Sequence, residues 1–200
     1  MKSAQGRRGE IELEKPDFTS PVYLPLNENR KEEFQQKLEL VGGKVFLSGS
    51  IDEAVQKFQE IILENRWTDM FCKDDMLQKY FSGKIGCSSD NQSFDQMQVG
   101  ITRCEFLVAH LGAILVSSAQ TSGRRMNVFP EIHVIFAHEE QLIDYLENGL
   151  EKIRKKYDGH LPSLISVITG PSRTADIEKT LVMGMHGPKS LFVFLCSKPF

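Results

Sequence analysis

Residues 163–196 read SLISVITGPSRTADIEKTLVMGMHGPKSLFVFLC, and the class of fold can be predicted from them. Its two apolar runs, SLISVIT and SLFVFLC, are continuous rather than alternating. Each is therefore expected to be a buried strand of a parallel sheet that is covered on both faces. The segment ADIEKTLVMG between them predicts a short helix that ends at Gly184. A strand, a loop and a helix in this order favour an α/β fold.

The rest of the chain continues this mixture of helices and strands. KEEFQQKLELVGG and SIDEAVQKFQEIILENRW predict helices, the second opened by a capping box of Ser50 and Glu53. Strands are expected at KVFLSG, at IHVIFA and on both sides of Gly112, over 106–109 and 113–116. DMFCKDDMLQKYF predicts a strand and a short helix, and EEQLIDYLENGLEKIRKKYD over 139–158 predicts the clearest helix. Residues 1–27 are expected to be a partly flexible extension, and residues 28–200 one domain.

Composition and charge limit the class of protein. The chain has 200 residues, of which 40% are hydrophobic and 26% charged, as in globular domains. A net charge of −3 argues against a nucleic-acid partner. No apolar run is long enough to span a bilayer, and the N-terminus lacks the apolar core of a secretory signal. We therefore expect a cytoplasmic protein with no membrane partner.

Cysteine spacing argues against a metal centre. The four cysteines form no CxxC pair, and no histidine stands at metal-ligand spacing from them. No zinc or iron–sulfur site is therefore expected. The cysteines are Cys72, Cys87, Cys104 and Cys196.

The loop after SLISVIT is a candidate anion site. Gly170 would let the backbone approach a ligand closely, and Arg173 would add donors to the free amides of a helix N-terminus. Ordinary turn chemistry explains the loop equally well, with Arg173 paired to Asp176 or Glu178. The ligand-binding candidates are Thr169, Gly170, Ser172, Arg173, Thr174, Asp176, Gly187 and Arg124.

Two more residues are candidates for acid–base chemistry. His186 stands in the HGP turn, where it could titrate near neutrality or simply be favoured by the preceding helix dipole. Glu105 lies upstream of SSAQTSGRR, a segment that could form a polar rim around an acidic ligand or a solvated loop. The catalytic candidates are therefore Glu105 and His186, and no metal ligand is assigned.

These segments resemble a known family. ITGPSRTADIEKTLVMGMHGP is similar to a signature of the LUD domain family, in its lactate utilisation protein C (YkgG-like) branch. VGITRCEFLVAHLGAILVSS and RRMNVFPEIHVIF are similar to two further blocks, so the resemblance runs from about residue 99 to 195. It differs over 110–113, where His-Leu-Gly-Ala stands in place of an acidic and hydroxyl-bearing turn.

The resemblance implies both a fold and a function. The fold would be a three-layer α/β/α sandwich with a mainly parallel sheet, similar to the sugar-phosphate isomerase and CoA-transferase group (NagB/RpiA/CoA-transferase-like). The function would be that of a non-redox subunit in a system that oxidises lactate to pyruvate, binding an anionic ligand or iron–sulfur partner subunits. No cofactor is expected, since no iron–sulfur or flavin motif is evident. Whether the chain forms a homodimer is left open by the sequence. The alternatives are a free-standing enzyme for an acyl, phosphate or nucleotide-like substrate, and a scaffold that has lost its site.

Overall fold

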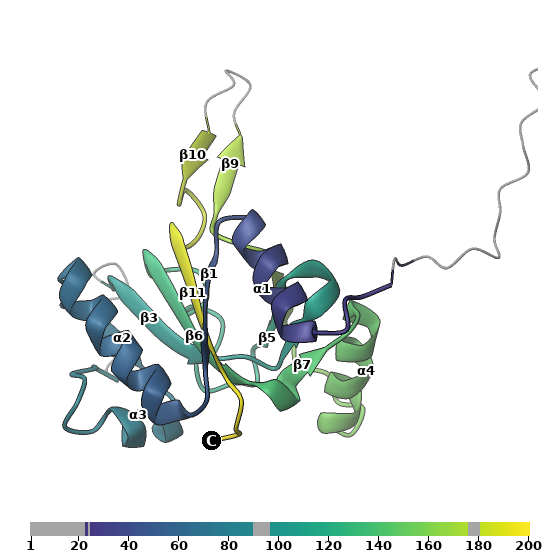
Figure 1. Ribbon diagram of the computed structural model, residues 1–200, viewed down its shortest axis with the longest axis horizontal. Helices are drawn as coiled ribbons and strands as arrows, with labels where there is room; N and C mark the ends of the chain where they lie inside the picture. Colours follow the sequence, from purple (N-terminus) through teal and green to yellow (C-terminus); the bar gives the residue numbers. More distant parts are fainter. Residues whose placement is uncertain (1–22, 24, 90–96, 176–180) are drawn as a thin grey trace, which may run out of the picture.

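The centre of the molecule is a five-stranded parallel sheet. The computed structural model describes residues 23, 25–89, 97–175 and 181–200. The central strands are β1 (Lys44–Ser48), β2 (Met70–Cys72), β3 (Val99–Arg103), β6 (Ile132–His138) and β11 (Ser190–Cys196). They pair in the order β1-β11-β6-β3-β2, and every pairing is parallel (Figure 1). The expected α/β fold with a mainly parallel sheet is confirmed.

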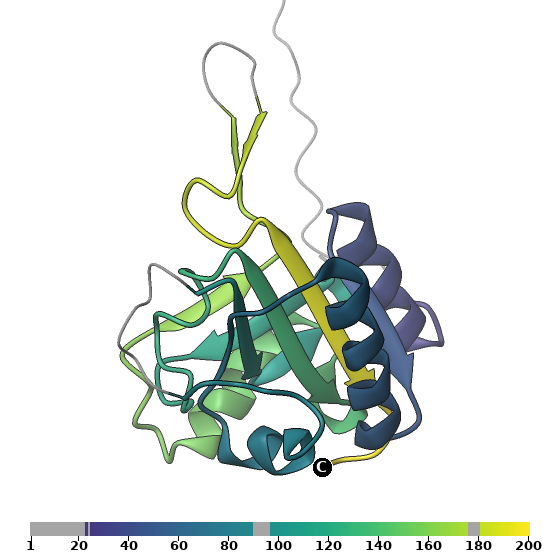
Figure 2. The ribbon, with the colours of Figure 1, turned by 90° about the vertical axis from the view of Figure 1, so that its left-hand side faces the viewer.

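Two helices cover one face of this sheet, α2 (Ile51–Asn65) and α3 (Asp75–Phe81) (Figure 2). The predicted cap begins α2, since the Ser50 hydroxyl accepts the Glu53 N–H at 3.3 Å. Phe58 of α2 is fully buried against Phe136 of β6 and Phe194 of β11, with ring centroids 5.6 and 5.5 Å away. The strands thus present alternate side chains to the two faces of the sheet, as the pleat requires.

The other face is covered by α1 (Arg30–Leu40) and by a second, four-stranded sheet. Its strands are β4 (Phe106–Val108), β5 (Ala113–Ser117), β7 (Leu142–Ile143) and β8 (Ile165–Ile168), in the order β7-β4-β5-β8. The helix α4 (Leu146–Lys156) packs on this sheet, and single 3-10 turns occupy Ala109–Leu111 and Glu139–Gln141. The expected strands on both sides of Gly112 are therefore β4 and β5, paired antiparallel.

Two elements differ from the expectation in this region. SLISVIT forms β8, an edge strand of the second sheet that is antiparallel to β5 and only partly buried, rather than a buried strand of the parallel sheet. The helix expected over 139–158 is confined to Leu146–Lys156, because its first residues form a 3-10 turn and β7. The first error arises because a short apolar run does not reveal which sheet it joins. The second arises because Leu142 and Ile143 pair with β4, a tertiary contact that the helical spacing does not reveal.

The helix expected over ADIEKTLVMG is wrong where the structure describes that segment. Arg173–Ala175 is β9 and Leu181–Met183 is β10, paired antiparallel with Ala175 opposite Leu181. The β-branched Thr174 and Val182 face each other across the hairpin, an arrangement that favours strands. Residues 176–180, which include the candidate Asp176, lie outside the described residues.

The N-terminal extension expected over 1–27 falls mostly outside the described residues. Of its described part, Tyr23 stacks on Tyr145 with ring centroids 4.6 Å apart and meets His110 edge to face. Within the described ranges, no helix is long and apolar enough to cross a membrane.

Candidate functional site

A cleft of about 410 Å³ opens where three strands of the parallel sheet end. β2, β3 and β6 run in the same direction, so their carboxyl ends meet at one edge. Open α/β sheets bind ligands at this edge. Residue 74, the segment 103–106, the turn 119–122 and a few side chains from 138 to 157 line the cleft. We call it the carboxyl-edge cleft.

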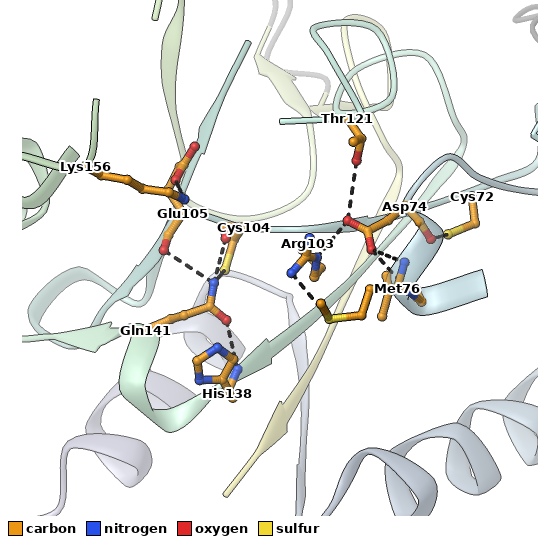
Figure 3. A network of polar contacts seen from close by, with 11 residues as sticks. Cys72, Asp74, Met76, Arg103, Cys104, Glu105, Thr121, His138, Gln141 and Lys156 are labelled. Atoms are coloured by element: carbon orange, nitrogen blue, oxygen red, sulfur yellow. Dashed lines mark hydrogen bonds and ion pairs between the residues drawn. The ribbon is translucent and has the colours of Figure 1, made fainter. Parts of the chain in front are cut away.

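One wall of the cleft is an ion pair between Asp74 and Arg103 (Figure 3). Asp74 follows β2 and caps α3, since its Oδ1 accepts the N–H groups of Met76 and Leu77, each at 3.1 Å. Its Oδ2 accepts the Arg103 Nε–H at 2.7 Å and the Thr121 hydroxyl at 3.4 Å. The buried carboxylate therefore fixes the guanidinium at the end of β3, beside the cleft.

The opposite wall is built around Glu105, which is 2% exposed. Its Oε1 accepts the hydroxyls of Ser117 at 2.6 Å and Tyr157 at 2.7 Å, and its Oε2 accepts Lys156 Nζ–H at 2.6 Å. Burial raises the pKa of Glu105, but these hydrogen bonds outweigh burial and leave the pKa below its usual value. Glu105 is thus an ionised acceptor whose two oxygens are both engaged.

Between these walls, Gln141 ties together the ends of β3 and β6. Its Nε2 donates to the Cys104 carbonyl at 2.6 Å, and its Oε1 accepts the His138 N–H at 3.0 Å (Figure 3). Burial lowers the pKa of the His138 imidazole, so the ring is neutral at neutral pH. A neutral ring offers the cleft one donor and one acceptor nitrogen.

The thiols at this edge are poor nucleophiles. Burial raises the pKa of Cys72 to about 12, and burial also raises the pKa of Cys104, beside Glu105. Since the thiolate is the reactive form, neither sulfur is suited to covalent chemistry at neutral pH. In the part of the chain that the structure describes, no group of three or more His, Cys, Asp or Glu residues could hold a metal ion.

The loop expected to bind an anion lies at the other edge of the sheet. The hairpin of β9 and β10 leads into the amino end of β11, and Lys189 N–H bonds the Glu131 carbonyl just before β6 begins. Ser172 N–H donates to the Pro188 carbonyl at 2.8 Å, and Gly184 N–H donates to the Ser172 carbonyl at 2.9 Å. The GPSR and HGP segments are therefore the two sides of one hairpin base.

The predicted site residues are thus divided between the two edges. Only Glu105 lies in the carboxyl-edge cleft. His186 and Gly187 line a separate pocket of about 410 Å³ beside the hairpin base, and Arg124 donates to the Ser163 hydroxyl at 2.7 Å. The residues at the base of the hairpin are Thr169, Gly170, Ser172, Arg173 and Thr174. With no helix beginning at the described part of this segment, the expected helix N-terminus is absent there.

Arg173 holds the hairpin against the body of the protein. Its Nη2 donates to the Val41 carbonyl at the end of α1, and Gly170, at φ 129°, lies against the same residue. An arginine that satisfies a helix-end carbonyl has a structural role that its sequence context did not suggest.

Replacing Arg173 by glutamine is expected to loosen the hairpin without unfolding the domain. One hydrogen bond at an exposed side chain is lost, so stability falls by less than about 1 kcal/mol. Amide hydrogen exchange should accelerate over 170–175 and 181–188 and stay unchanged at the carboxyl-edge cleft. Equal acceleration at both edges would contradict this assignment of Arg173.

Several residues of the cleft were not predicted from the sequence, among them Asp74, Arg103, His138 and Lys156. A usable signal existed for two of them. Arg103 ends the strand VGITR, and His138 directly follows IHVIFA, so both stand at carboxyl ends of buried strands. Lys156 comes from α4, and no local pattern places it at this edge. Residues 119–122 of SSAQTSGRR, the segment that could form a polar rim or a solvated loop, line the cleft together with Glu105.

Comparison with known proteins identifies the family. The LUD domain model matches residues 87–196, and the chain belongs to the LUD domain family. It falls in the branch that contains lactate utilization protein C and YkgG. A crystal structure of a DUF162 family protein from Deinococcus radiodurans has a similar fold, with a TM-score of 0.58 and 16% identity over 86% of this chain and 99% of that one.

The curated relatives are longer than this chain. Lactate utilization protein C of Bacillus licheniformis is 27% identical over 158 residues, which cover 78% of this chain and 63% of that protein. The protein of the same name from Bacillus subtilis is 32% identical, covering 52% and 44%. Uncharacterized protein YkgG of Escherichia coli is 31% identical, covering 50% and 45%. The chain therefore spans about half of the length of most of these relatives.

Proposed function

We propose that this chain is the non-redox component of a cytoplasmic lactate-utilisation system and acts through the carboxyl-edge cleft. The observation that carries the proposal is the similarity to proteins named lactate utilization protein C. The position of the cleft supports it, because sheets of this class bind ligands at their carboxyl edge. Electron transfer is assigned to iron–sulfur partners, since the scattered cysteines of this chain suit no cluster.

The test is lactate-dependent dye reduction in extracts of a strain that lacks this protein, with purified variants added back. The wild-type chain should restore the activity, and Arg103→Gln should restore at most about a tenth of it, the loss expected for one interaction with a charged group. Arg124→Gln is the matched control, because Arg124 contacts Ser163 outside the cleft and should restore full activity. Circular dichroism shows that each variant is folded.

The other results of this assay have distinct meanings. If the wild-type chain restores nothing, the lactate role is wrong. If Arg103→Gln restores as much as the wild type, the role stands, but the chain acts as a scaffold and the cleft is not used. Turnover by the isolated chain on an acyl, phosphate or nucleotide-like substrate would favour the free-standing enzyme instead.

A further inference from the structure

We propose that the ligand of the carboxyl-edge cleft is an oxyanion that carries a neighbouring hydroxyl group. Its anionic group would lie on Arg103 and Lys156, and its hydroxyl on the turn that contains Ser122. This inference deepens the proposed function and rests on it for the biological setting, but the chemistry comes from the cleft itself. Carboxylates and phosphates share this chemistry, and the experiment distinguishes them.

The carboxylate oxygens of the cleft are already engaged by the protein. Both oxygens of Asp74 accept hydrogen bonds, Oδ1 from two backbone amides and Oδ2 from Arg103 and Thr121. Both oxygens of Glu105 are likewise engaged, by two hydroxyls and one ammonium. Both carboxylate side chains are also buried, Asp74 at 7% and Glu105 at 0% exposed, so neither is open to a cationic ligand, and the acidic groups do not define the ligand.

The cations of the cleft retain free donors. Arg103 gives its Nε–H to Asp74 and places Nη1 3.8 Å from the weak acceptor Met76 Sδ, while Nη2 donates to no other described residue. Lys156 gives one N–H to Glu105 and has two more, on a side chain that is 53% exposed. Both cations thus have N–H donors without an acceptor among the described residues. They favour a ligand that supplies a negatively charged acceptor, most strongly a carboxylate or a phosphate.

Ser122 provides an independent observation. It lines the cleft and is 7% exposed, and its hydroxyl has no hydrogen-bond partner among the residues that the structure describes. Buried polar groups without partners are rare because each one is destabilising, and they call for a ligand or a water. A hydroxyl group, which both donates and accepts, can satisfy the Ser122 hydroxyl.

The volume of the cleft indicates the size of the ligand that it can hold. A volume of about 410 Å³ lies in the range of small-molecule sites. The cleft therefore has room for an acid or a phosphate that carries one or more hydroxyl groups, and not only for a bare anion.

The experiment is calorimetric titration of the purified full chain with five probes: lactate, glycerate, glycerol 3-phosphate, propionate and inorganic phosphate. We expect the tightest binding from glycerate or glycerol 3-phosphate, and the order of these two distinguishes a carboxylate site from a phosphate site. Propionate and inorganic phosphate, which lack the hydroxyl, should bind at least tenfold more weakly. Equal binding of all five probes, or binding of none, would overturn the inference.

Two variants locate the binding. Ser122→Ala removes a hydroxyl that has no partner among the described residues, so it should fold as the wild type does and weaken the best probe about tenfold. Arg173→Gln, the matched control at the hairpin, should bind that probe as the wild type does. Undiminished binding by Ser122→Ala, or loss of binding in Arg173→Gln, would refute the assignment.

The two proposals can fail separately. Restored lactate oxidation together with no probe binding would refute the ligand and leave the proposed function standing. Hydroxyl-dependent binding by a chain that restores no lactate oxidation would refute the proposed function and leave the ligand standing.

Discussion

Replacing Gly112 by alanine is expected to lower the free energy of unfolding by about 3 kcal/mol, measured by urea denaturation. Gly112 turns the chain between β4 and β5 at φ 59°, a conformation that L side chains rarely adopt. A Cβ there would lie 2.4 Å from the backbone nitrogen of Leu38 and 2.6 Å from the carbonyl carbon of Lys37. Because backbone of α1 cannot yield as a side chain can, α1 must shift away from the sheet.

Gly123→Ala is the matched control for this prediction. Gly123 has φ 61°, but a Cβ at that position meets no atom of the described residues within 4 Å. This variant carries the backbone strain alone and should lose about 1 kcal/mol. The difference between the two variants isolates the close approach of α1 to the β4–β5 turn. Equal losses would contradict the packing described for Gly112.

Replacing Glu105 by glutamine is expected to lower the free energy of unfolding by about 2 kcal/mol at pH 7, because three donors lose a charged acceptor. The effect should depend on pH. The folded pKa of Glu105 lies below the reference value of 4.5, so its stabilisation is fully present above pH 4.5 and is lost as the pH falls through the folded pKa. The stability gap between wild type and variant should therefore be constant from pH 6 to 8 and shrink in acid.

Glu131→Gln is the control for the charge change. Glu131 pairs with Lys189 at 2.7 Å, but both side chains are more than half exposed, so the variant should lose at most ~0.5 kcal/mol. Urea midpoints measured from pH 3 to 8 provide the comparison. A gap between wild type and Glu105→Gln that stays constant down to pH 3 would contradict an ionised, hydrogen-bonded Glu105.

The strands that could be predicted are those whose apolar pattern matches their burial in the fold. SLFVFLC and IHVIFA are continuous apolar runs because both faces of β11 and β6 are covered, and their burial follows from that pattern. SLISVIT has a similar pattern yet forms an edge strand of a second sheet. SLISVIT differs from the other two runs because it pairs with β5. Tertiary contacts determine this pairing, and the sequence of the run does not indicate it.

The candidate site was predictable only in part. Glu105 was a candidate because it lies upstream of SSAQTSGRR, and both line the cleft, although the role of Glu105 as a buried acceptor was not evident. The anion site was expected in the loop after SLISVIT, but that strand belongs to the second sheet, and the loop lies at the hairpin base. Arg103 and His138 could have been predicted, because VGITR ends with the first, IHVIFA ends just before the second, and parallel sheets bind ligands at the carboxyl ends of their strands. Lys156 joins them only through the fold.

The most direct test of the central claim, that ligand binding occurs at the carboxyl edge, is amide hydrogen exchange with and without saturating glycerate. We expect protection over 103–106, 117–123 and 138–141, with no change over 169–175 and 181–189. Those ranges follow the walls of the cleft and the base of the hairpin. Protection confined to the hairpin base would contradict ligand binding at the carboxyl edge and would place the site in the loop after SLISVIT.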